Sequence, residues 1–235
     1  MINDIRIEIC IGNVQDGLKA SEYPIDRIEL NSALELGGLS PSLETLKYLK
    51  EKISTKICCM VRPRGGDFFY TEEEFEVMLK DARNFLENKA DGIVFGFLDK
   101  NGAIDIDRTK KMSELIHSYN KEAIFHKAFD ELEDQDEGTR ILIGCGIDRI
   151  LTSGKAVYPD ILEGCERIKK LNKKYGDRIQ FLPGGGVRIE NIADVLKTSG
   201  VSQIHMTSKK EYKGNYLGLD TDQLEKMLEK ISSLE

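Results

Sequence analysis

Strand-like and helix-like segments alternate along the whole chain, and this alternation limits the possible folds more than any other feature. Residues 6–11 alternate polar and apolar side chains, as a half-buried strand does. Strands that alternate with helices pair in parallel through right-handed crossovers. We count eight such units. Their strands are expected at 6–11, 26–31, 57–61, 91–98, 123–129, 148–152, 178–182 and 203–206.

The number of units selects the architecture. Eight units in 235 residues match a closed (β/α)8 TIM barrel with parallel strands. No linker-like or low-complexity segment interrupts them, so we expect a single domain over residues 1–235. A doubly wound open sheet is the alternative. The first strand is not followed by GxGxxG, which argues against that alternative and against a nucleotide cofactor.

Short polar side chains indicate where the helices begin. Thr71 and Glu74 form a capping box ahead of a regular apolar face. We expect further helix N-caps at Ser40, with Pro41 in the first turn, and at Asp107, Asp134 and Thr221.

Charge and composition exclude several classes of protein. A formal net charge of −7 argues against general attraction to nucleic acid or to an anionic membrane. No apolar run is long enough to span a bilayer, and the first residues lack the pattern of a secretion signal. The five cysteines are odd in number and show no CxxC spacing, as in proteins of a reducing compartment. We therefore expect a cytoplasmic protein without nucleic-acid or membrane partners.

One predicted strand ends in two arginines. Arg62 and Arg64 flank Pro63 directly after the apolar residues 57–61, and a double glycine follows them. The proline keeps the preceding residue extended and stops the ladder, while the glycines permit a sharp turn. Ligands of parallel α/β proteins bind at the carboxyl ends of strands. We therefore expect Arg62 and Arg64 to bind a small anion.

Polar residues at other strand ends complete a candidate catalytic site. His126 could act as a base, with Asp130 orienting its ring. Glu8 and Glu29 occupy similar places in the first two strands and could also move protons. The strand-end residues that we considered are Glu8, Glu29, Arg62, Arg64, His126, Asp130, Thr152, Ser153 and, as a weaker candidate, His205.

A structural role is the alternative for the same residues. A buried carboxylate is costly unless it is paired with a guanidinium, and such ion pairs can support a barrel without doing chemistry. The two glutamates fit either interpretation. For His126 the alternative is a hydrogen-bonded imidazole of the core.

A second candidate anion site follows the seventh predicted strand. Gly184, Gly185 and Gly186 let backbone N–H groups approach an anion, and a helix N-terminus after them would add partial positive charge. TIM barrels often bind phosphate at the loops after strands seven and eight, so Thr207 and Ser208 would complete the site. A tight turn with nothing bound is the alternative.

The cysteines suggest a metal ion less directly. Cys58 and Cys59 are adjacent in a strand and point to opposite faces, so they cannot share one ion. Cys10 offers a soft thiolate, and Met60 or Met206 a thioether, which are ligands that suit Cu(I). A buried free cysteine is more often a small apolar side chain.

Five motifs stand in order along the chain. They are RPRGGDFFY from Arg62, DGIVFGFL from Asp91, FHKAFD from Phe125, RILTSG from Arg149 and LPGGGV from Leu182. Together they resemble the CutC family of copper-homeostasis proteins, over nearly the whole chain. The resemblance implies a cytoplasmic TIM barrel that forms a homo-oligomer, a dimer or a tetramer, and takes part in copper handling.

Two positions depart from the pattern of that family. Its first two strands commonly end in Glu-x-Cys and Glu-Leu-Cys, and the two cysteines are the favoured Cu(I) ligands. Cys10 matches the first, whereas Asn31 stands in the second position, and an amide is a poor ligand for a soft ion. Lys127 replaces the usual arginine, which keeps the charge and loses the planar fork.

Two functions follow from these observations. The first is copper homeostasis, with Cys10 as a ligand of Cu(I) and the copper ion as partner. The second is an enzyme of unassigned reaction that acts on a small phosphate- or carboxylate-bearing metabolite by acid–base chemistry. In the second case Arg62, Arg64 and the triple glycine would bind the anion, and aromatic residues 68–70 would cover it. A scaffold without a site would leave the strand-end charges unexplained.

Overall fold

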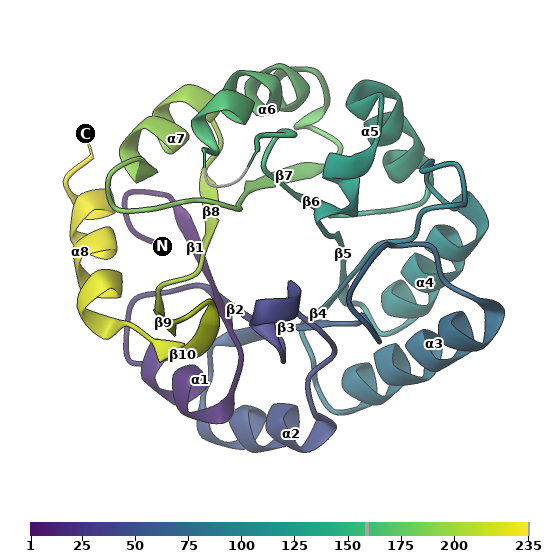
Figure 1. Cartoon of the computed structure of the whole chain (residues 1–235), viewed down its shortest axis with the longest axis horizontal. Coiled ribbons are helices and arrows are strands. Elements are labelled where there is room, and N and C mark those ends of the chain that lie inside the picture. The colour runs from purple at the N-terminus through teal and green to yellow at the C-terminus, as the bar shows by residue number, and fades with distance from the viewer. Residues whose placement is uncertain (158–159, 235) are drawn as a thin grey trace.

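The protein is a barrel of parallel strands surrounded by helices. The computed structural model describes residues 1–157 and 160–234. Within them, eight parallel strands follow the order β7-β6-β5-β4-β3-β2-β1-β8, and Figure 1 looks into the ring that they form. The predicted (β/α)8 barrel is confirmed. The strands are β1 Arg6–Ile11, β2 Arg27–Leu30, β3 Lys56–Met60, β4 Gly92–Phe95, β5 Glu122–Phe125, β6 Arg149–Thr152, β7 Gln180–Pro183 and β8 Gln203–Met206.

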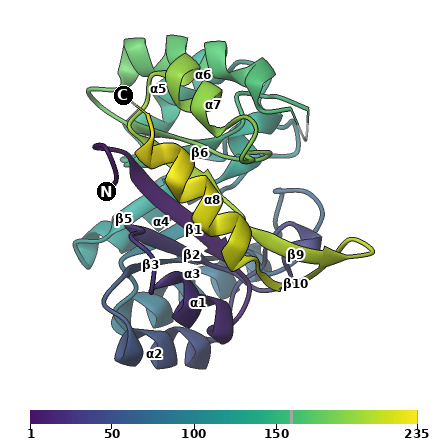
Figure 2. The same ribbon diagram turned by 90° about the vertical axis from the view of Figure 1, so that its left-hand side faces the viewer.

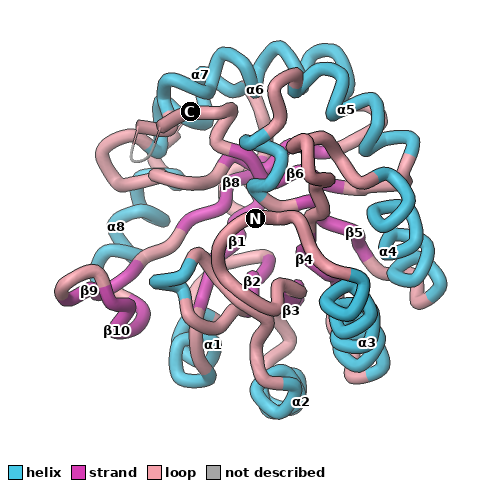
Figure 3. The backbone as a smooth tube through the Cα atoms, turned by 45° about the vertical axis from the view of Figure 1, so that its right-hand side comes forward, coloured by secondary structure: helices cyan, strands magenta, loops and turns pink. Residues whose placement is uncertain are grey.

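The helices form an outer ring around the strands, as Figure 3 shows in cyan and magenta. In the described part of the chain, no helix has the length and apolar character needed to cross a membrane. The helices are α1 Val14–Ala20, α2 Leu43–Lys52, α3 Glu72–Glu87, α4 Ile106–Ser118, α5 Gln135–Gly144, α6 Leu162–Tyr175, α7 Ile192–Ser199 and α8 Thr221–Ser232, with short 3-10 turns η1 Leu34–Leu36 and η2 Lys127–Glu131.

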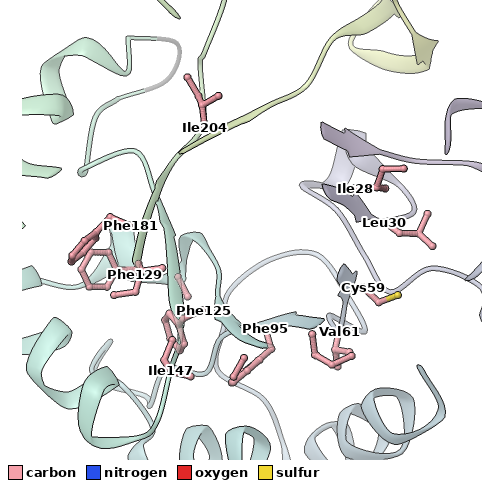
Figure 4. Close-up of a cluster of buried hydrophobic side chains, with 14 of the residues drawn as sticks. Ile28, Leu30, Cys59, Val61, Phe95, Phe125, Phe129, Ile147, Phe181 and Ile204 are labelled. Carbon is pink, nitrogen blue, oxygen red and sulfur yellow. The ribbon is translucent and has the colours of Figure 1, made fainter. Parts of the chain in front are cut away.

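Alternate residues of each strand point to opposite sides of the barrel wall. One set packs against the helices and forms the main core, of which Figure 4 shows Phe95, Phe125 and Phe181. Burying each such side chain stabilises the fold by about 1.5–3 kcal/mol. The other set points into the barrel. There Cys58, Met60, Val94 and Ile124 form a second, smaller apolar cluster.

The barrel is bridged between β7 and β8 by a side chain. In the described strands the backbone ladder runs from β7 round to β8 without joining its two ends. Gln203 of β8 donates from Nε2 to the backbone oxygen of Phe181, at 3.0 Å. Its Oε1 accepts from Arg27, at 2.9 Å, so one amide connects the two end strands to the charged interior.

Two of the predicted helix starts are confirmed. Thr71 and Glu74 form the capping box of α3, and the side chain of Asp134 accepts two N–H groups at the start of α5. Two others are displaced: α4 is capped by Asp105 instead of Asp107, and α8 by Asp220 instead of Thr221.

The predicted cap at Ser40 is wrong, because this serine has another partner. Its hydroxyl accepts from the N–H of Arg62 and its own N–H donates to the Arg62 oxygen, both at 2.9 Å. Ser40 therefore holds the chain in place just after the end of β3, at Arg62. Helix α2 begins later, at Leu43.

Two further differences lie near the mouth. Strand β5 ends at Phe125, whereas we expected it to continue to residue 129. Residues 127–131 form the turn η2 instead. Residues 209–219 form an unpredicted hairpin of β9 Lys209–Tyr212 and β10 Asn215–Leu219. Figure 2 shows the hairpin projecting on the side away from both chain ends. Asp16 holds its base, accepting from the Tyr216 hydroxyl at 2.6 Å and from the Leu219 N–H at 2.8 Å.

Candidate functional site

A cavity of about 260 Å³ lies at the carboxyl ends of the strands, and we call it the mouth cavity. This is the end of a TIM barrel at which active sites are found. The residues that matter below are Cys10, Glu29, Asn31, Met60, Arg62, Phe68, His126, Lys127, Gly185, Gly186, Arg188, His205, Met206, Thr207 and Lys209.

A layer of paired charges lies inside the barrel beneath the cavity. We call Glu8, Arg27, Glu122 and Arg149 the floor layer. The Oε2 atom of Glu8 accepts from Arg27 Nε at 2.8 Å and from Arg149 Nη1 at 3.4 Å, and Arg149 also binds Glu122. The three side chains of Glu8, Arg27 and Arg149 are almost completely buried. Buried charges of opposite sign are stable together only because each satisfies the other.

Both carboxylate oxygens of Glu8 are bound by other side chains, which favours the structural interpretation of this residue. Its Oε1 lies 2.8 Å from His205 Nδ1. Burial alone would raise the pKa of Glu8, but the hydrogen bond from His205 and the charges of Arg27, His205 and Arg149 outweigh it. The pKa therefore falls well below its usual range. The carboxylate stays ionised and orients His205.

Three potential metal ligands meet above the floor layer. Cys10 Sγ, one Glu29 carboxylate oxygen and one His205 ring nitrogen all lie within 4.8 Å of one another, and all three residues are buried. They come from the adjacent strands β1, β2 and β8. Glu29 is level with Cys10 and not with Glu8, because the strands are staggered around the barrel. The similarity of Glu8 and Glu29 in sequence therefore does not extend to their positions.

Asn31 links two members of this cluster. Its Nδ2 donates to Glu29 Oε1 at 2.8 Å and lies 3.3 Å from Cys10 Sγ. The position at which the family pattern has a cysteine is thus in direct contact with the Cys10 thiol. Thr207 also contacts this thiol.

The electrostatics of the cluster follow from burial and from mutual charges. Burial raises the pKa of Glu29, and the charge of Glu8 adds to it. Burial opposes protonation of His205, but Glu29 and Glu8 outweigh it, so the pKa of His205 is raised. Burial and Glu29 raise the pKa of the Cys10 thiol well above its ordinary value. A bound cation would displace protons from this cluster.

Asp130 does not orient His126, contrary to our expectation. The Asp130 carboxylate accepts from the hydroxyl groups of Thr152 and Ser153, and so fixes the end of β6. The turn η2 carries it away from the ring. His126 Nδ1 accepts instead from the N–H of Ala128, at 3.1 Å. Burial and the charge of Arg62 lower the pKa of His126 to about 3, so this ring is neutral.

Arg62 lines the mouth cavity, as expected, but most of its guanidinium binds the protein. Nη1 donates to the oxygens of Leu36 and Gly38, and Nη2 donates to that of Gly66. The guanidinium also lies over the ring of Phe68, with 5.1 Å between Cζ and the ring centroid. Of the three aromatic residues expected to cover the mouth, Phe68 alone is among the described residues that line the cavity.

Arg64 does not line the cavity in the described structure, and its part in anion binding stays a prediction. Its Nε binds Glu74 at 2.6 Å and its Nη1 binds Asp67 at 3.1 Å. Spacing along an extended strand would place Arg64 on the side of Arg62. The chain has already turned at Pro63, so Arg64 instead ties this loop to the start of α3.

The three consecutive glycines have two different roles: one permits close packing, and the other two line the mouth cavity. A Cβ on Gly184 would lie 2.6 Å from Leu151, so this glycine permits close packing. Gly185 and Gly186 line the cavity with φ of 94° and 97°, and a Cβ on Gly185 would lie 2.8 Å from Lys127 Nζ. The helix that we expected directly after them begins only at Ile192, so its N-terminus is displaced from the glycines.

The two predicted residues after β8 also separate. Thr207 lines the cavity. The Ser208 hydroxyl donates to the backbone oxygen of Asp220 at 2.6 Å and closes the base of the hairpin, and Ser208 is not among the described residues that line the cavity. Sequence reasoning missed Arg27 and Arg149 of the floor layer and Arg188 and Lys209 at the rim. Charged residues at alternate positions of buried strands were the available signal for the first pair.

Comparisons with known proteins agree with the motifs. The family model described as the CutC family matches residues 5–210. A protein named CutC from Treponema denticola is 43% identical over 209 residues, covering 89% of this chain and 83% of that protein. The human protein named copper homeostasis protein cutC homolog is 35% identical over 207 residues, covering 88% and 74%.

Solved structures show the same relationship. The structure of CutC from Streptococcus agalactiae matches with a TM-score of 0.79 and 33% identity, over 86% of this chain and 97% of that chain. Phosphoribosyl anthranilate isomerase from Thermotoga maritima matches with a TM-score of 0.62 and 16% identity, over 98% and 100%, which shows a shared barrel fold only. On the family model and these relatives together, the chain belongs to the CutC family.

Proposed function

We propose that this protein takes part in copper homeostasis by binding Cu(I) in the mouth cavity, with Cys10 and His205 as ligands. The observation that carries the proposal is the cluster of Cys10, Glu29 and His205 within 4.8 Å. Thiolate and imidazole are ligands that Cu(I) accepts, and the thioethers of Met60 and Met206 line the same cavity.

The surroundings of His205 support a role as ligand. Glu8 binds Nδ1, which leaves Nε2 for a metal ion. A carboxylate that holds the second ring nitrogen is the usual support of a metal-binding histidine. The floor layer fixes Glu8 in turn, through Arg27 and Arg149. A copper ion, His205, Glu8 and Arg27 would thus form one line of contacts, with the ion at one end and Arg27 at the other.

A competition titration tests the proposal. Reduced protein is titrated with Cu(I) against a coloured Cu(I) chelator of known affinity. We expect one equivalent to bind tightly, and Cys10→Ala and His205→Ala each to weaken binding by more than about tenfold. Cys145→Ala is the matched control, because this buried thiol lies beside α4, in contact with the Ile106 oxygen. Equal affinity of Cys10→Ala and the control would reject the proposal.

Asn31→Cys gives the converse test. The amide nitrogen of Asn31 lies 3.3 Å from Cys10 Sγ, so a thiol at this position would add a second soft ligand. We expect tighter Cu(I) binding than in the unchanged protein, measured in the same competition. Asn31→Ser is the control, because it removes the amide without adding a soft ligand.

A second candidate function is catalysis on a small anionic metabolite. It is favoured by Lys127, Arg188 and Lys209, which line the cavity of a chain of net charge −7, although Lys209 also pairs with Glu211 at 2.6 Å. Lys127 is placed against Gly185, whose backbone would share the anion. Thermal-shift measurements with phosphate and small carboxylates test it. Lys127→Met should lose any stabilisation seen, and an anion that stabilises both proteins equally would count against this function.

The cellular setting stays a set of predictions. We propose a cytoplasmic location, a single domain over residues 1–235, and a homo-oligomer, either a dimer or a tetramer. Light scattering coupled to size-exclusion chromatography measures the oligomer directly. A monomer at micromolar concentration would contradict the last of these predictions.

A further inference from the structure

Two buried nitrogen atoms at the mouth cavity have no hydrogen-bond partner in the described part of the chain. They are Nε2 of His126 and Nε of Arg62. Both residues line the cavity, and their exposed fractions are only 4% and 6%. A buried polar group without a partner costs about 1–3 kcal/mol, so folded proteins seldom retain two such groups around one cavity without a use for them.

The proton of His126 is on Nε2. The backbone N–H of Ala128 can only donate, and it points at Nδ1 from 3.1 Å. Nδ1 must therefore accept and carries no proton, so a neutral ring holds its proton on the other nitrogen. His126 is thus a hydrogen-bond donor toward a ligand, and it is not the base that the sequence suggested.

Arg62 has one donor that is not bound to a backbone oxygen, and the Tyr70 hydroxyl also lies close to its guanidinium. Its Nη atoms bind the backbone oxygens of Leu36, Gly38 and Gly66, which leaves Nε–H. Phe68 contacts both residues: its ring lies 5.1 Å from the guanidinium and 4.8 Å from the imidazole centroid. The two donors are therefore held by packing before any ligand arrives, which is the condition for strong electrostatic binding of an oxygen atom.

Strand β2, which pairs with β3, carries an acceptor at the same cavity. Glu29 Oε2 is also buried and without a partner among the described residues, while its Oε1 binds Asn31. A ligand that forms hydrogen bonds with all three atoms has an acceptor oxygen for His126 and Arg62 and a hydroxyl for Glu29. The cavity of about 260 Å³ has room for a compound of about ten non-hydrogen atoms, at roughly 30 Å³ for each group of the size of a water molecule.

We propose that His126 and Arg62 form a donor pair that binds the carbonyl or carboxylate oxygen of a small hydroxy compound, whose hydroxyl contacts Glu29. In this role His126 polarises the bound oxygen. The inference rests on the second proposed function and names its ligand class. It can be tested without copper, because neither Cys10 nor His205, the proposed copper ligands, takes part in it.

Nitrogen NMR of the histidine rings tests the inference, with glycolate, pyruvate and inorganic phosphate as probes. In the free protein we expect His126 to hold one tautomer, protonated on Nε2, from about pH 5 to about pH 8. Glycolate should shift the Nε2 signal, and pyruvate, which has no hydroxyl for Glu29, should bind more weakly. His126→Phe and Arg62→Met should each weaken the binding of glycolate by more than about tenfold, as the loss of a charge-assisted or buried hydrogen bond does. His117→Gln, on the exposed face of α4, should leave it unchanged.

Several outcomes would overturn the inference. A proton on Nδ1, or titration of His126 near its ordinary pKa of about 6.5, would do so without any ligand. An unshifted Nε2 signal with all three probes would also do so. Phosphate binding that depends on Lys127 but leaves Nε2 unshifted would overturn the donor pair while the second function stands. The tautomer and the shift are measured in the unchanged protein, so the test does not depend on whether a variant folds.

Discussion

The floor layer and the mouth cavity use the same kinds of residue in different ways. In the floor layer Glu8 is bound by two arginines and a histidine, and its charge is fully engaged. At the mouth, Glu29, Arg62 and His126 each keep one buried polar atom without a partner among the described residues, and in the floor layer Arg149 Nε is such an atom as well. The two layers are neighbours along the strands: Glu8 of the floor layer and Cys10 of the mouth cavity are two residues apart on β1. The paired charges of the floor layer support the barrel, whereas the unpaired atoms of the mouth line a cavity that a ligand could enter.

The largest expected effect is on the floor layer. Glu8→Gln leaves Arg27 and Arg149 buried without their shared carboxylate, and we expect the free energy of unfolding to fall by about 3–5 kcal/mol. Urea unfolding at neutral pH measures it. Glu122→Gln is the control, because the Glu122 side chain is 35% exposed and water can replace it. A loss as small as that of the control would mean that the floor layer does not support the barrel.

The next effect is the loss of stability at acidic pH that arises from His126. Its ring stays neutral in the folded protein down to about pH 3, whereas in the unfolded chain it takes up a proton below about pH 6.5. Stability is therefore lost as the pH falls through this window, by up to about 1.4 kcal/mol per pH unit. His126→Gln should remove this contribution. Unfolding curves of both proteins at several pH values measure it, and equal slopes would contradict a neutral buried ring.

His205 should show the opposite sign. Its pKa is raised in the folded protein by Glu29 and Glu8, against the effect of burial. It therefore contributes stability that is complete below about pH 6.5 and is lost as the pH rises through the folded pKa. In metal-free protein, His205→Gln should be most destabilising at acidic pH and less so at alkaline pH. The same loss at both ends of the range would show that Glu8 and Glu29 do not hold a proton on this ring.

The smallest effect is expected at Arg64. Its side chain is 37% exposed and pairs with Glu74 and Asp67 at the surface. Exposed ion pairs contribute about 0–1 kcal/mol, so Arg64→Ala should change the free energy of unfolding by no more than this. It should leave the binding of Cu(I) and of small anions unchanged. A loss of anion binding would show that Arg64 takes part in the site, although it does not line the cavity in the described structure.

Much of the fold was predictable because it depends on local patterns. The strands β1 and β8 lie at the predicted residues, and the other six overlap with theirs. The capping box of Thr71 and Glu74 is a local exchange of hydrogen bonds and is present. Predictions failed where a distant partner intervened, as for Ser40, whose hydroxyl binds the backbone of Arg62 and not the start of a helix.

Residue patterns alone were enough to predict the barrel, the family and the strand ends at which polar residues gather. Which of these residues meet depends on packing in three dimensions. The two-residue period places Glu8 and Cys10 on one face of β1, but the stagger between strands sets Glu29 beside Cys10. The pairing of Arg64 with Glu74, and of Asp130 with Thr152, likewise depends on where separate elements come together. Periodicity fixes the direction of a side chain along its own strand, and packing between strands and loops fixes its partner.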